Sequence, residues 1–82
     1  MNILHDYIED YLEYAEFRKH LDYKTLKAYR IDLKQYEIFS PELPICFFKS
    51  TVDQFITTLH KQYKSKTIKR KIASLKAFFH YL

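Results

Sequence analysis

Apolar residues recur at steps of three and four along four stretches of this chain, which is the spacing of helices that bury one side. The first stretch runs from about Ile3 to Arg18 and the second follows Asp22 and runs to about Phe39. The third begins near Ser50, and the fourth follows Lys64-Ser65 and runs to the end of the chain. The predicted buried stripes are Leu4, Tyr7, Ile8, Tyr11, Leu12 and Ala15; Leu26, Tyr29, Leu33 and Tyr36; Val52, Phe55, Ile56 and Leu59; and Ile68, Ile72, Leu75, Phe79 and Leu82. The pattern predicts four helices.

Residues that begin and end helices separate these stretches. Asp22 is a good N-cap for the second helix, and Ser50 with Asp53 has the spacing of a capping box for the third. Pro41 and Pro44 end the second helix, and the apolar segment 45–48 is expected to tuck between the helix pairs. The chain has no Gly, which argues against hairpins of strands. The predicted fold is all-α, a small orthogonal four-helix bundle made of two helical hairpins.

The length and composition set limits on this fold. Eighty-two residues are expected to form one domain over 1–82, with a small core filled by the seven Phe and eight Tyr. No apolar run is long enough to span a membrane, and the acidic N-terminal segment does not resemble a signal peptide. The single Cys46 excludes an internal disulfide, favours a reducing cytoplasmic setting, and is expected to be buried and inert.

Charge is distributed unevenly around a net value of +4. Residues 1–17 contain five acids and no Lys or Arg, whereas residues 54–82 contain seven Lys and Arg and no acid. This polarity indicates one surface suited to a polyanion and another that is not. The alternative is that the lysines only keep a helix soluble.

A lysine-rich phrase at the start of the second helix is repeated at the start of the fourth, 42 residues later. The first copy reads Leu21-Asp22-Tyr23-Lys24-Thr25-Leu26-Lys27 and the second reads Tyr63-Lys64-Ser65-Lys66-Thr67-Ile68-Lys69. A helix start has unpaired N–H groups and a partial positive charge, so both starts are candidate phosphate-binding sites. Each threonine could instead serve only its own helix cap.

Other chemistry is less well supported by the sequence. Tyr29, Phe78 and Phe79 could stack on bases, but their helical spacing favours the core. His5 and Glu9 lie four residues apart without a third ligand nearby, so no metal or other cofactor is expected.

Two of the helices carry sequence signatures that resemble a known family. Leu21-Asp22-x-x-Thr25-Leu26-x-Ala28-Tyr29-x-x-Asp32-Leu33 is similar to the first signature of the N-terminal core-binding, SAM-like domain of tyrosine recombinases, and the segment 67–82 is similar to the second. The resemblance covers the whole chain. Two departures are the turn Tyr63-Lys64-Ser65, where the family commonly has Gly-Leu-Ser, and Asp22, where it often has Ser.

The resemblance implies a DNA-binding domain that forms half of a clamp around duplex DNA near a strand-exchange site. In that family a separate catalytic domain follows, so this chain is expected to be no enzyme by itself. The positions implied to contact DNA are Lys24, Thr25, Lys27, Arg30, Lys34, Lys66, Thr67, Lys69, Arg70, Lys71 and Lys76. The alternative function is a SAM-like helical protein–protein interaction module.

The resemblance also implies a second partner, namely other recombinase protomers assembled as a tetramer on DNA. Tyr14 and Phe17 fall off the main apolar stripe of the first helix, so that helix is a candidate protomer contact. The alternative is that both aromatic side chains fold into the core. The isolated domain is expected to be monomeric.

Overall fold

The computed structural model describes residues 3–40 and 45–82. Its elements are α1 (Ile3–Phe17), α2 (Tyr23–Phe39), a short 3-10 helix η1 (Ile45–Phe47), α3 (Lys49–Gln62) and α4 (Ser65–Tyr81). No strand occurs among the described residues, which confirms the all-α prediction. Pro41 and Pro44, expected to end the second helix, lie outside the described residues.

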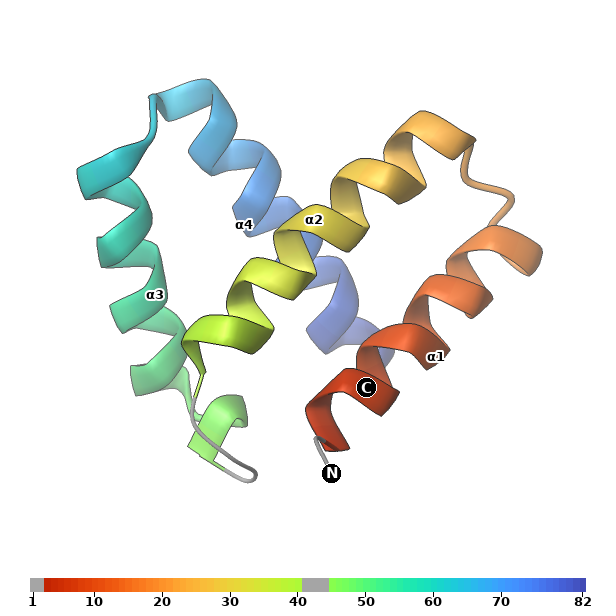
Figure 1. Ribbon diagram of the computed structural model, residues 1–82, viewed down its shortest axis with the longest axis horizontal. Helices are drawn as coiled ribbons and strands as arrows, with labels where there is room; N and C mark the ends of the chain where they lie inside the picture. The colour runs from red at the N-terminus through yellow and green to blue at the C-terminus, as the bar shows by residue number, and fades with distance from the viewer. Residues whose placement is uncertain (1–2, 41–44) are drawn as a thin grey trace.

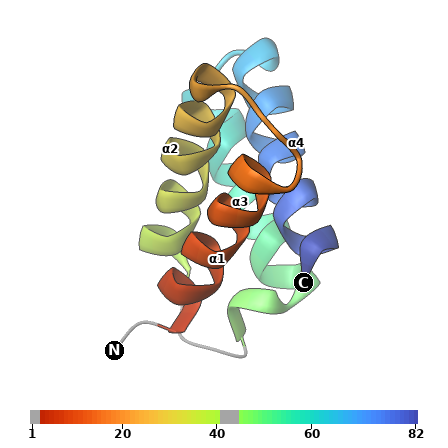
Figure 2. The same ribbon diagram turned by 90° about the vertical axis from the view of Figure 1, so that its right-hand side faces the viewer.

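The helices form two pairs that meet where α2 crosses α4. α1 lies beside α2 and α3 lies beside α4, with α2 passing in front of α4 in the view of Figure 1. The turned view in Figure 2 shows α2 and α4 on opposite sides of the molecule, with α1 in front and α3 behind. The crossing of α2 and α4 is therefore the junction of the two hairpins.

The helix starts differ in how they are capped. The side chain of Asp22 accepts a hydrogen bond from the backbone N–H of Thr25 at 2.8 Å, as the capping prediction requires. The expected capping box at Ser50 is wrong, because the extended residue before α3 is Phe48 and no side chain caps this helix. Asp53 instead lies 3.7 Å from the ammonium group of Lys49.

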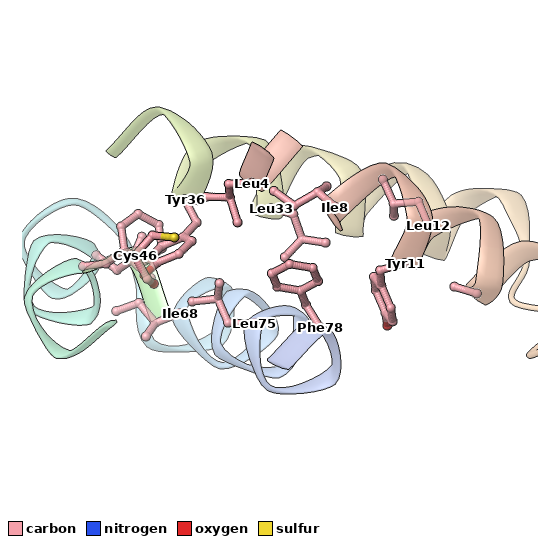
Figure 3. Packing of buried hydrophobic residues seen from close by; sticks show 13 residues of the cluster. Leu4, Ile8, Tyr11, Leu12, Leu33, Tyr36, Cys46, Ile68, Leu75 and Phe78 are labelled. Atoms are coloured by element: carbon pink, nitrogen blue, oxygen red, sulfur yellow. The ribbon is translucent and has the colours of Figure 1, made fainter. Parts of the chain in front are cut away.

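A core of apolar side chains joins α1, α2, α3, α4 and η1. Its fully buried members include Leu33, Tyr36 and Phe78, and Figure 3 shows the last of these between residues of α1 and α2. The predicted stripe of α1 is buried except for Tyr7, which is exposed at the edge and packs edge-on against Phe47. Bulky rings thus supply much of a small core.

Cys46 lies inside this core, as predicted. Its side chain is fully buried, and the hydroxyl of Tyr36 donates a hydrogen bond to its backbone carbonyl. Burial raises the pKa of the Cys46 thiol. Segment 45–47 is therefore anchored to α2.

The predicted core stripe of α4 is turned by about one residue. The buried residues are Ile68, Lys71, Ser74, Leu75 and Phe78, whereas Ile72 and Phe79 are half-buried and Leu82 is exposed. The reason is polar, because Lys71 and Ser74 both face a buried carboxylate on α2. Hydrophobic spacing alone did not reveal that this carboxylate needs polar partners on α4.

Candidate nucleic-acid interface

α2 and α4 have the same length of 17 residues, and their starts are Tyr23 and Ser65. Each residue of α2 therefore has an equivalent in α4 that lies 42 positions later. Two equivalent residues touch at the crossing, where the Ser74 hydroxyl donates a hydrogen bond to Asp32 at 2.8 Å. Helices that touch through equivalent residues are related by an approximate twofold axis through the contact.

Six lysines occupy equivalent exposed positions on these two helices. They are Lys24, Lys27 and Lys34 on α2 and Lys66, Lys69 and Lys76 on α4. At 3.6 residues per turn, positions spaced by three and seven lie on one side of a helix. This side is nearly opposite the buried positions Tyr36 and its equivalent Phe78. Figure 1 shows α2 and α4 beginning at the same, upper end of the molecule, so the two lysine rows start at the same end. We call them the twin lysine rows.

The two helix starts beside these rows differ in charge. Hydrogen bonds from the backbone and side chain of Thr25 lower the pKa of Asp22, so a carboxylate already occupies the first start. The equivalent residue of α4 is Lys64, and no side chain caps that start. Thr25 and Thr67 are both half-buried. The start of α4 is therefore better suited to an anion than that of α2.

Arg30 does not lie on the twin lysine rows. Its guanidinium donates to both carboxylate oxygens of Glu9 on α1, at 2.7 and 3.0 Å. A second contact between the same helices joins His5 and Glu37 at 3.1 Å. The sequence grouped Arg30 with Lys27 and Lys34, but the structure turns it toward the acidic helix.

A buried carboxylate organises the crossing of α2 and α4. Asp32 is only 1% exposed and accepts hydrogen bonds from three side chains of α4. Arg70 donates to both of its oxygens at 2.8 and 3.2 Å, Lys71 at 2.9 Å and Ser74 at 2.8 Å. Two cations thus face one buried anion.

Lys71 requires a correction to the predicted set of DNA contacts. Its side chain is 4% exposed and its ammonium group lies against Asp32, so it does not reach the protein surface. It also donates to Gln35 and lies 4.9 Å from the ring centre of Tyr63. The Gln35 amide in turn donates to the Tyr63 hydroxyl at 2.8 Å. Lys71 is therefore part of the helix junction.

Sequence reasoning missed Asp32, Gln35, Tyr63 and Ser74 as members of this junction. One signal was present, since Asp32 falls beside Leu33 and Tyr36 on an otherwise apolar side of its helix. A charged residue in such a stripe needs a partner of opposite charge. The partner itself lies about forty positions away and has no local signature.

The predicted base-stacking residues lie in or against the core. Phe78 is fully buried, and Phe79 packs edge-on against Tyr36 with ring centres 5.9 Å apart. Tyr29 is half-buried against the same cluster.

The described part of the chain contains no group of three or more metal-ligating residues. Its helices also lack a span of the length and hydropathy that a membrane crossing needs.

The acidic surface lies on α1. Asp6, Asp10, Glu13 and Glu16 are exposed, and Phe17 at the end of the helix is 64% exposed. Tyr14 is half-buried and stacks on Tyr81 with ring centres 4.8 Å apart. A shallow groove here is lined by Asp10, Glu13, Tyr14, Phe17, Arg18 and Tyr81.

Comparisons with known proteins agree on one family. The model for the phage integrase N-terminal SAM-like domain matches residues 8–82. A tyrosine recombinase of Agathobacter rectalis is 49% identical over 83 residues, which cover 100% of this chain and 27% of that protein. Tyrosine recombinase XerD of Staphylococcus haemolyticus is 33% identical over 76 residues, covering 87% of this chain and 26% of that protein. Tyrosine recombinase XerC of Oceanobacillus iheyensis is 31% identical over 87 residues, covering 100% and 28%.

The chain spans just over a quarter of the length of these curated relatives. No solved structure matches it.

Proposed function

The chain belongs to the family of phage integrase N-terminal SAM-like domains, and from that membership we propose that it binds double-stranded DNA for a tyrosine recombinase. In this role it would form one half of a clamp around the duplex near the site of strand exchange. The observation that carries the proposal is the pair of twin lysine rows on two crossing helices.

The twin lysine rows suit a regular polyanion. Their members are exposed, and both rows start at the same end of the molecule, where α2 and α4 begin. Duplex DNA offers two strands of phosphates, so each row has a strand to contact. The proposed contacts are Lys24, Thr25, Lys27, Lys34, Lys66, Thr67, Lys69, Arg70 and Lys76. Lys71 is left out because it is buried against Asp32, and Arg30 because it pairs with Glu9 of the acidic helix.

Binding of this kind is mainly electrostatic. Lysine ammonium groups act as point charges on phosphate and carry little sequence information. The carboxylate of Asp22 weakens the contribution of the first helix start, so α4 is expected to contribute more than α2. The domain would therefore hold DNA in register and leave most base recognition to other parts of a recombinase.

We assign the covalent chemistry of recombination to other regions of the parent protein. The chain contains only three arginines, and in the structure Arg30 pairs with Glu9 and Arg70 with Asp32. None of these contacts places a cluster of arginines around a tyrosine. The domain would bind DNA without cleaving it.

A salt titration tests the proposal. We expect the purified 82-residue domain to bind a fluorescent duplex weakly, and the logarithm of the association constant to fall with the logarithm of salt concentration at a slope of about −4 to −5, for about five phosphates. Fluorescence anisotropy between low and physiological salt measures the slope. Binding that is indifferent to salt, or absent at low salt, would contradict the proposal.

A second candidate function rests on α1. Exposed Phe17 beside Asp10 and Glu13 is unsuited to DNA but suited to a basic protein surface. We infer that this surface contacts a neighbouring protomer when DNA gathers several subunits. A protein-interaction role alone, without DNA, would be favoured if duplex binding failed while a basic protein partner bound α1.

A further inference from the structure

We propose that Asp32 is a positioning residue that aims Arg70 at a DNA phosphate, with Lys71 as the buried counterion that allows it to do so. The proposal rests on the proposed function and deepens it. It assigns a role to the buried cluster at the crossing of α2 and α4, which lies next to the twin lysine rows.

The guanidinium of Arg70 is held by one edge only. Its Nε and one Nη2 hydrogen are donated to the two oxygens of Asp32, at 3.2 and 2.8 Å. A guanidinium has five N–H donors in a rigid plane, so three remain on the other edge. The side chain is 48% exposed, so this second edge reaches solvent. Such a fork matches the oxygens of a phosphate.

Asp32 can hold Arg70 in this orientation because other groups already anchor the carboxylate. Lys71 and Ser74 donate to it from inside the protein, and Asp32 itself is buried. The three ionic groups carry one negative and two positive charges, so one positive charge is left over. Lys71 is enclosed, which leaves Arg70 as the member whose charge a phosphate can approach.

The position of Arg70 fits this role. It directly follows Lys69 and lies one turn after Lys66, so it borders the lysine row of α4. Its equivalent on α2 is Ala28, a small residue that offers no donor. Arg70 would thus supply one oriented, two-pronged contact among lysines that contribute point charges.

Arg30 provides a matched comparison within the same chain. It is also about half exposed and also paired with a carboxylate, but the Glu9 side chain is itself 41% exposed and belongs to the acidic helix, whereas Asp32 is buried. No buried cation supports that pair. Arg30 and Arg70 therefore have the same charge and similar exposure, but Arg30 is held toward the acidic helix and Arg70 beside the lysine row of α4.

Conservative substitutions separate the two arginines. Arg70→Lys keeps the charge but removes the planar fork, and we expect it to weaken duplex binding about tenfold. Arg30→Lys should change binding by less than about twofold, because exposed pairs contribute little. Both variants are measured by anisotropy on the same duplex at one salt concentration, with thermal unfolding as the check of folding. Equal effects of the two substitutions would overturn the inference.

A double-mutant cycle tests whether Asp32 acts through Arg70. Asp32→Asn keeps the shape of the side chain but offers Arg70 and Lys71 a single shared carbonyl oxygen. We expect it to weaken duplex binding by about as much as Arg70→Lys does. The double variant with Arg70→Lys should then bind no more than about twofold more weakly than Arg70→Lys alone. Fully additive losses would mean that Asp32 does not act through Arg70.

A measurement on the unmodified domain covers the case in which Asp32→Asn does not fold. In a ¹⁵N NMR spectrum we expect a sharp Nε–H signal of Arg70, protected from exchange and retained when duplex is added. A signal typical of a freely solvated arginine would overturn the inference even if the domain binds DNA. Loss of all salt-dependent DNA binding with this signal intact would instead overturn the proposed function and, with it, the role of Arg70.

Discussion

The hydroxyl of Ser74 donates a hydrogen bond of 2.8 Å to the carboxylate of Asp32, and the two residues hold equivalent positions in two helices of equal length. The contact marks an approximate twofold axis between the helical hairpins. Because both helices repeat the same lysine spacing and begin at the same end of the molecule, the repeat in sequence becomes two matching exposed rows that start at that end.

Charge reversal should distinguish the two surfaces of the domain. Lys69→Glu with Lys76→Glu should abolish duplex binding at physiological salt, because two phosphate contacts become repulsive. Glu13→Lys with Glu16→Lys changes as many charges on α1 and should leave binding intact or improve it. Glu9 is unsuitable for this control because it pairs with Arg30. Anisotropy gives the ranking, and the opposite ranking would favour the protein-interaction function.

Removing Asp32 from the buried cluster should cost more stability than removing Lys71. Asp32→Ala leaves the enclosed Lys71 without its counterion and should lower the free energy of unfolding by about 3–5 kcal/mol. Lys71→Met fills a similar volume and leaves Asp32 with Arg70 and Ser74, so we expect a loss below about 2 kcal/mol. Urea denaturation measures both. Equal losses would show that Lys71 is the main partner of Asp32.

Tyr36 should make the fold sensitive to alkaline pH. Burial, with a smaller effect of Cys46, raises the pKa of Tyr36 to about 12 from 10.0. Because the pKa of Tyr36 is higher in the folded than in the unfolded state, the stability contributed by its neutral hydroxyl is complete below pH 10. That stability is lost as the pH rises from about 10 to about 12. The urea midpoint should therefore fall across that window.

Tyr36→Phe is the control for the alkaline transition. It should cost about 1 kcal/mol at neutral pH, because the hydrogen bond to the Cys46 carbonyl is lost. Its alkaline decline should be shallower but not absent, since burial also raises the pKa values of Tyr11 and Cys46. An unchanged decline in the variant would exclude Tyr36 as its source.

Glycine in place of His20, in the turn between α1 and α2, should stabilise the fold. His20 has a φ of 55°, in the left-handed region that costs a residue with a Cβ about 1–2 kcal/mol. His20→Gly is expected to raise the free energy of unfolding by about 1 kcal/mol. His60→Gly, in the last turn of α3, should instead lower it by up to about 1 kcal/mol. Destabilisation by both substitutions would mean that the His20 side chain has a stabilising contact.

Phe17 should matter for assembly and not for DNA affinity. The domain alone is expected to be monomeric by light scattering, because one exposed ring and its surroundings bury too little area for a stable dimer. On a duplex long enough for two copies, chemical cross-linking should give dimers that Phe17→Asp removes. Phe48→Asp, at an exposed aromatic residue on another segment, should leave them. Cross-linked dimers that persist in Phe17→Asp would exclude this surface.

The sequence by itself determined the four helices, because helix formation follows local spacing and local caps. The stripe Leu4, Ile8, Leu12 and Ala15 is buried as its periodicity predicts, and Asp22 caps α2 through a bond to a residue three positions away. The repeat of 42 residues was also visible, as were the signatures that resemble the recombinase family. All of these features depend on residues close together in the chain.

Only the tertiary structure decided which cations are paired with carboxylates. The resemblance placed Arg30 and Lys71 with the DNA-binding candidates, but each is bound by a carboxylate on another helix, Glu9 and Asp32. On α4, which places Lys71 and Ser74 against this buried Asp32, Phe78 is fully buried and Phe79 only partly. A buried charge must find its counterion wherever the fold provides one, and that partner lies far away in sequence. Hydrophobic spacing along one helix therefore carries no record of it.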